Sequence, residues 1–175
     1  MLRRLASDRR GMAAVEFALI APIMILLYMG LAELSLAMMA ERRAAHSASI
    51  VADLVAQSNQ MDGVQMTDIF NVGDAILKPF PTTPLKIRVT SVTADAAGVA
   101  RVIWSQGHGL GALGSGTAVG GVPGGLLLPG DSIIMADVQY AFTSPLHHTI
   151  PTGLLFSETF FLRPRRSPSV VWTGP

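Results

Sequence analysis

The stretch FALIAPIMILLYMGLA, residues 17–32, decides the fold of this chain, because it holds no charge between Glu16 and Glu33. A helix of this length spans roughly 24 Å, and the apolar flanks MAAV and LSLAMMA extend it past the roughly 30 Å hydrocarbon core of a bilayer. The composition therefore predicts a transmembrane helix over residues 12–40. A buried helix of a soluble protein could be equally apolar, but it would rarely follow an arginine-rich N-terminus so directly.

The charges on either side of this stretch predict its orientation. Four arginines lie within residues 3–10, and positive residues in a short N-terminal flank stay in the cytoplasm. The cluster Glu41-Arg42-Arg43 on the far side weakens the contrast without reversing it. We therefore expect a single-pass protein of the bacterial inner membrane, with a cytoplasmic N-terminus and with residues 41–175 in the periplasm.

A cleaved secretory signal peptide is the alternative to a permanent anchor. Its apolar region would be only about 7–15 residues long and would end in a small-x-small cleavage site. The apolar stretch here is longer, and Met38-Met39-Ala40 places a bulky residue three positions before the cut. We therefore favour the anchor.

The residues at the start of the helix form a more specific pattern. The run RRGMAAVEFAL, residues 9–19, has a basic leader ending in Gly11, four further residues, Glu16, and then Phe17 opening the apolar helix. It resembles a prepilin processing site. The longer stretch AAVEFALIAPIMILLYMGLAELS, residues 13–35, resembles the TadE-like family of pilin-like proteins from the tight-adherence (Tad, or Flp) pilus system. The resemblance covers residues 9 to about 43, a quarter of the chain.

This resemblance implies a processing step and a function. A prepilin peptidase would cut between Gly11 and Met12, while Arg9 and Arg10 hold the leader, residues 1–11, at the cytoplasmic face. The product would be a minor pilin or pseudopilin of a type IVb pilus used for adhesion and surface attachment. Its partners would be the peptidase, the major pilin, other minor pilins and the inner-membrane assembly platform. The alternative is an uncleaved single-pass protein with a periplasmic binding head.

Physical chemistry explains why a processing site would have a glycine at position 11 and a carboxylate at position 16. Glycine before a cut removes side-chain bulk from the cleft of a protease, although Gly11 could also be a simple flexible joint. A carboxylate at the edge of hydrocarbon is costly and usually finds a partner. In pilins the implied partner of Glu16 is the free amine of the mature N-terminus, here Met12, and their attraction can set the register between subunits. The alternative is that Glu16 marks the cytoplasmic interface of a plain anchor.

Two further residues of the helix are candidates for assembly. Pro22 removes one helical hydrogen bond and bends the helix, which either shapes it for packing among pilin-like helices or has no consequence. Glu33 lies toward the exit side of the bilayer. We favour an interfacial carboxylate there over a partner for an arginine of a neighbouring subunit.

Beyond the membrane, the pattern predicts an α+β head. Apolar residues continue at helical spacing, so one helix should run from about Met12 to Gln57. The resemblance implies the same architecture, a pilin-like head of antiparallel strands packed on the outer half of the long helix. We expect a helix over Val64–Leu77, weakened by Gly73, a turn at Asp95–Gly98, and strands from Lys86 onward and over Val99–Trp104, Ser132–Phe142 and Leu154–Leu162.

The segment 107–125 is rich in glycine. It contains GLGALG at 109–114, which matches a dinucleotide-binding fingerprint, but further Gly and Pro prevent the helix that this motif requires. We expect a flexible loop, whose lack of charge would permit contact with another subunit.

Composition excludes several other classes of function. The chain has 13 basic and 12 acidic side chains, and this near-neutral balance argues against a nucleic-acid partner. It has no cysteine, which excludes disulfides and thiolate metal sites. The four histidines, His46, His108, His147 and His148, lack metal-ligand spacing, and no nucleophile motif occurs. We expect no cofactor, no metal and no enzymatic activity.

Overall fold

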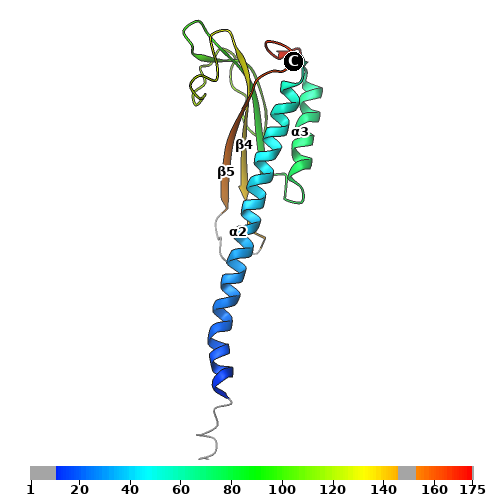
Figure 1. Cartoon of the computed structure of the whole chain (residues 1–175). Coiled ribbons are helices and arrows are strands. Elements are labelled where there is room, and N and C mark those ends of the chain that lie inside the picture. The colour runs from blue at the N-terminus through cyan, green and yellow to red at the C-terminus, as the bar shows by residue number, and fades with distance from the viewer. Residues whose placement is uncertain (1–10, 146–152, 175) are drawn as a thin grey trace, which may run out of the picture. The chain divides into compact units, whose positions relative to one another are not determined.

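The computed structural model describes residues 11–145 and 153–174 of the chain. It divides into two compact units, one of Met1–Met38 with Thr143–Gly153 and the other of Met39–Phe142 with Leu154–Pro175. The regular elements, labelled in Figure 1, are α2 (Met12–Ala56), β1 (Gln60–Met61), α3 (Gly63–Leu77), β2 (Leu85–Ala94), β3 (Ala100–His108), β4 (Ser132–Phe142), β5 (Leu154–Leu162) and β6 (Val171–Trp172).

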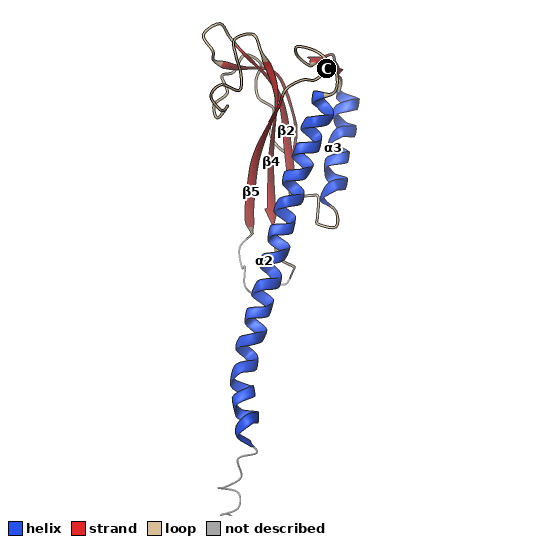
Figure 2. Ribbon diagram, viewed as in Figure 1, coloured by secondary structure: helices blue, strands red, loops and turns tan. Residues whose placement is uncertain are grey.

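The second unit, which we call the head, contains a four-stranded antiparallel sheet in the order β3-β2-β4-β5. The outer half of α2 and the shorter helix α3 belong to the same unit (Figure 2). A long N-terminal apolar helix followed by an antiparallel sheet confirms the predicted α+β class. The strands predicted at Ser132–Phe142 and Leu154–Leu162 have the bounds found for β4 and β5.

Small side chains line the buried stripe of α2 in the head. The fully buried positions recur every three or four residues, as a helix packed along one side requires, and they are mostly alanine. Alanine allows a helix to approach its neighbours closely, but each alanine buries only a small apolar area. The stripe consists of Ala40, Ala44, Ala48, Val51, Ala52 and Val55.

Gly73 lies where α3 meets α2 and the sheet. A Cβ atom at this position would come within 3.0 Å of Ile87 Cδ1 and Ser47 Oγ and within 3.1 Å of Val51 Cγ2. The Ser47 hydroxyl also donates a buried hydrogen bond of 2.8 Å to the carbonyl of Gly73. Gly73 was expected only to weaken α3, but its missing side chain is what permits this three-way contact.

Gly73→Val should therefore destabilise the head by about 1–3 kcal/mol, the usual cost of overpacking a filled core. The measurement is urea unfolding of the full chain in detergent, followed by the fluorescence of Trp104, which is buried. Gly120→Val is the matched control, because a Cβ at Gly120 would meet nothing within 4 Å. Equal stabilities of the two variants would contradict this packing account.

The turn between β2 and β3 forms at Asp95, as predicted. Its carboxylate accepts hydrogen bonds of 2.9 Å from the amides of Ala97 and Val99 and of 2.8 Å from Arg101 Nε. The Arg101 hydrogen bond, with those of the amides, lowers the pKa of the Asp95 carboxyl below its ordinary value. An aspartate that accepts from its own following backbone is typical of such turns.

The glycine-rich segment is a loop from Gly109 onward, as expected, and it packs on the sheet. Three of its apolar side chains, together with the two leucines that follow it, pack against a small cluster of Val92, Ala100, Ile133 and Met135. No helix follows the GLGALG run at any of residues 109–131, as the neighbouring glycines and Pro123 predicted. The packed side chains are Leu113, Val119, Val122, Leu126 and Leu127.

The C-terminal segment 163–174 closes the end of the head and was not predicted. The amide of Arg165 donates to the carbonyl of Ala56 at the last residue of α2, and its guanidinium pairs with Asp53 at 2.6 Å. The indole of Trp104 donates to the carbonyl of Val170 at 2.7 Å. Immediately after Val170, β6 pairs in parallel with β1. These contacts join the C-terminal segment to the end of α2, to β3 and to β1.

Candidate functional site

The candidate site is the N-terminal part of α2. Its large apolar side chains are exposed on every side of the helix, which the fold of a soluble protein would not allow. The helix is long and apolar enough to cross a membrane. Its length and composition suit it to anchoring the chain in a membrane. Examples from all around the helix are Val15, Phe17, Leu19, Ile20, Ile23, Met24 and Tyr28.

Gly11 immediately precedes the first residue of α2, Met12. A Cβ atom at Gly11 would meet nothing within 4 Å, and both residues are exposed. The junction between Gly11 and Met12 is thus accessible in the described part of the chain. Arg9 and Arg10, predicted to hold the leader, lie outside the described residues.

Glu16 lies one helical turn after Met12, so both side chains occupy the same face of α2. Glu16 is exposed and makes no hydrogen bond or ion pair with any described residue. The adjacent Phe17 is 73% exposed. The fold of the described chain therefore gives neither side chain a packing or hydrogen-bonding role.

Pro22 does not end the helix, since α2 continues unbroken from Met12 to Ala56. Its side chain is exposed, so its ring contributes no packing inside the described structure. Whether its role is in packing between helices stays a prediction.

Glu33 is placed differently from our expectation of an interfacial carboxylate. It is fully buried and interacts within the chain, as does the buried Ser144 of the same unit. Burial leaves no access for an arginine of a neighbouring subunit. The helical spacing explains the burial of Glu33. Glu33, Ala37 and Ala40 follow one another at intervals of four and three residues, so they lie on the same buried side of α2.

Arg43, which we counted only as a charge beyond the membrane, has a structural partner. Its guanidinium donates to the carbonyl of Ile76 at 3.3 Å and to that of Lys78. These carbonyls lie at the end of α3, where a helix has unpaired acceptors and the negative end of its dipole. Arg43 therefore joins α2 to the end of α3 within the head.

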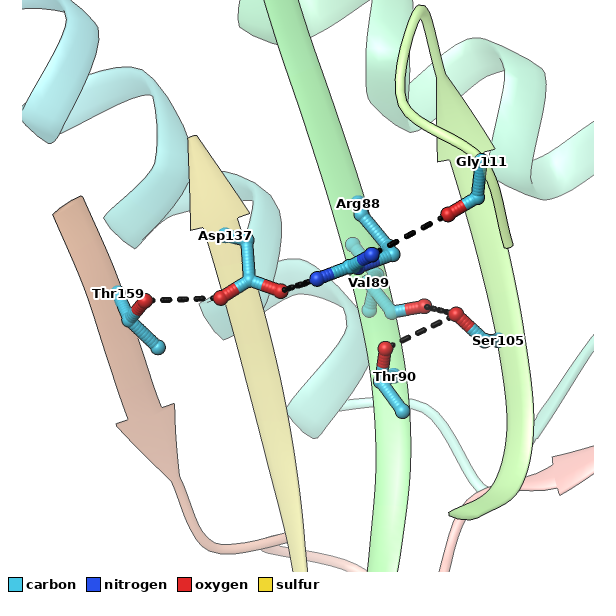
Figure 3. Close-up of polar contacts among 7 residues, drawn as sticks. All are labelled: Arg88, Val89, Thr90, Ser105, Gly111, Asp137 and Thr159. Atoms are coloured by element: carbon cyan, nitrogen blue, oxygen red, sulfur yellow. Dashed lines mark hydrogen bonds and ion pairs between the residues drawn. The ribbon is translucent and has the colours of Figure 1, made fainter. Parts of the chain in front are cut away.

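A polar cluster lies on the sheet of the head, and Figure 3 shows its contacts. Two nitrogens of Arg88 donate to Asp137 Oδ2, at 2.7 and 3.0 Å, and Thr159 donates to Asp137 Oδ1 at 2.8 Å. A third nitrogen of Arg88 donates to the carbonyl of Gly111. These groups satisfy one another across β2, β4, β5 and the glycine-rich segment, so the cluster is structural.

The histidines do not form a site in the described chain. His108 stacks on Phe70, with ring centroids 5.6 Å apart, and lies 3.7 Å from Asp74. His46 is exposed, and His147 and His148 fall outside the described residues. Within residues 11–145 and 153–174, no three His, Cys, Asp or Glu side chains gather as a metal site would require.

Comparison with known proteins gives one match. Residues 11–53 match the sequence model of the family described as TadE-like protein. A search of curated proteins and a search of solved structures each give no match. The matched segment begins at Gly11 and runs along α2 almost to its end, which agrees with the resemblance seen in the sequence.

Proposed function

We propose that this chain is a minor pilin or pseudopilin of a Tad pilus, and the match of residues 11–53 to the TadE-like family model supports this proposal. A prepilin peptidase removes residues 1–11, and the protein then assembles through the exposed part of α2. Its partners are the major pilin, other minor pilins and the assembly platform of the inner membrane. The head lies in the periplasm, or outside the cell once the subunit enters a pilus.

One observation supports this proposal most strongly. The family match begins at Gly11, the residue at which an accessible junction meets the start of an exposed apolar helix. Glu16 stands one turn into that helix without a partner among the described residues. A plain anchor needs apolar length, but it does not need a glycine junction followed at this spacing by a lone carboxylate.

The structural role of Arg43 also supports a periplasmic head. Basic residues just beyond a membrane helix oppose the orientation that its leader arginines favour. Arg43 binds the carbonyls of Ile76 and Lys78 at the end of α3, so its position has a structural explanation.

The function is tested by deleting the protein from its host and restoring it. Deletion should strongly reduce surface pili, and the full chain should restore them. Residues 41–175 exported alone behind a cleavable signal peptide should not, because they lack the helix through which the protein assembles. Normal piliation in the deletion strain would overturn the proposal and favour an uncleaved membrane-anchored binding protein.

A further inference from the structure

The two edges of the head sheet differ in how they are covered. At β3, the glycine-rich segment adds its own backbone to the edge. The amide of Val102 donates to Thr117 at 3.0 Å, and its carbonyl accepts from Gly116 at 2.8 Å. Val119 donates to Ala100 at 2.8 Å. This end of the β3 edge is therefore closed by the chain itself.

The opposite edge, β5, is open. β5 pairs with β4 along all nine of its residues, from Leu154 to Leu162. On its other side, no described residue pairs with its backbone. Its sequence, LLFSETFFL, has no proline or lysine, which edge strands commonly use to prevent pairing, and Leu155 is 66% exposed. Such an edge is a template for a further strand.

Glu158 at the centre of β5 indicates what kind of strand fits. It is the only charged residue of β5, it is exposed, and it has no partner among the described residues. Phe156 and Phe160 are its neighbours on the same face of the sheet and are half-buried. Opposite charges facing each other on adjacent strands stabilise a sheet, whereas like charges destabilise it.

We propose that β5 receives a strand from a different pilus subunit, one that places a lysine or arginine opposite Glu158 and apolar side chains opposite the two phenylalanines. The main chain of β5 would provide the hydrogen bonds, and Glu158 would select the partner and its register. This inference rests on the proposed function, since it names the surface by which the head contacts its neighbours.

A second copy of this chain fits the β5 edge poorly. Register-matched pairing of two β5 strands, whether parallel or antiparallel about Glu158, would place two carboxylates against each other.

The absence of cysteine makes a direct test possible, because a single introduced thiol is unique in the chain. Ser157→Cys on β5 should react readily with a thiol-specific maleimide in the protein purified in detergent. In host membranes that contain the pilus machinery, its labelling should be about tenfold slower, the factor that corresponds to 1.4 kcal/mol. Asp68→Cys, an exposed position on α3, is the control and should react equally in both states.

Adding Glu158→Lys to the Ser157→Cys variant should restore fast labelling in membranes, because the partner's basic residue would then face a like charge. Asp68→Lys in the same background should not. Amide hydrogen exchange of the peptide 154–162 provides a backbone measurement, since strand pairing should slow it whereas side-chain crowding alone should not.

Equally fast labelling in both states, with the protein still co-purifying with pilins, would overturn the β5 proposal and leave the proposed function intact. If the unaltered protein did not co-purify with pilins, the proposed function would be overturned instead. A disulfide-linked dimer of Ser157→Cys chains in membranes would show a second copy at this edge and contradict our choice of partner. If labelling of the Ser157→Cys thiol stays slow in membranes after Glu158→Lys is added, the charge of Glu158 does not select the partner.

Discussion

Glu16→Gln should leave the protein cleaved but unable to assemble. Glutamine keeps the size and polarity of the side chain and removes its charge, so the peptidase, which meets the Gly11 junction, should still cut. The Met12 ammonium of a neighbouring subunit would then lose its counter-charge at the edge of hydrocarbon. An unpaired charge in such a medium is strongly disfavoured.

The expected loss is large. Two unit charges 4 Å apart attract by about 4 kcal/mol at an effective dielectric of about 20, and each 1.4 kcal/mol is about tenfold in association. We therefore expect at least a roughly tenfold drop in the pilin that co-purifies with the cleaved variant, and a matching loss of surface pili.

The matched control for this substitution is Glu41→Gln, a carboxylate on the same helix but in the head unit. Glu33→Gln is not a suitable control, because Glu33 is buried and its replacement would disturb the fold. Normal co-purification and piliation with cleaved Glu16→Gln would contradict the assembly role. Glu16 would then be an interfacial residue of a plain anchor.

Gly11→Leu should block processing and accumulate a membrane-bound precursor. Because a Cβ at Gly11 would meet nothing within 4 Å, the substitution should not disturb the described fold, and the defect should be in recognition by the peptidase. Cleavage removes four of the thirteen basic and one of the twelve acidic side chains, so the side-chain net charge changes from +1 in the precursor to −2 in the product.

Gel mobility and isoelectric focusing of membrane extracts measure both changes in the Gly11→Leu variant. Ala14→Leu introduces the same side chain three residues later and should still be processed. If the Gly11→Leu protein has the same size and isoelectric point as the unaltered protein from the same cells, cleavage at this junction does not occur.

The features that could be predicted from the sequence are those with a regular period. Alternation of side chains from Lys86 onward identified β2, and the helical spacing from Ala44 to Val55 extended α2 beyond the membrane. The small strands β1 and β6 have two residues each, which is too short for any period, and only the backbone pairing of distant segments defines them.

The glycine-rich segment and Glu33 show why the remaining features could not be predicted. The apolar residues of the segment are spaced irregularly between glycines, so only the folded sheet reveals that they cover Val92 and Ile133. Glu33 has the helical spacing of the buried stripe, but a carboxylate at such a position contradicts the usual cost of burial. Its partners within the chain are set by tertiary structure, about which local sequence carries no information.

We expect this chain to be made as a precursor and cut after Gly11. The most direct measurement is the intact mass and N-terminal sequence of the protein purified from the membranes of its own host. Our account predicts a chain that lacks residues 1–11 and begins at Met12. A chain that retains Arg9, Arg10 and Gly11 would contradict it and leave an uncleaved membrane anchor.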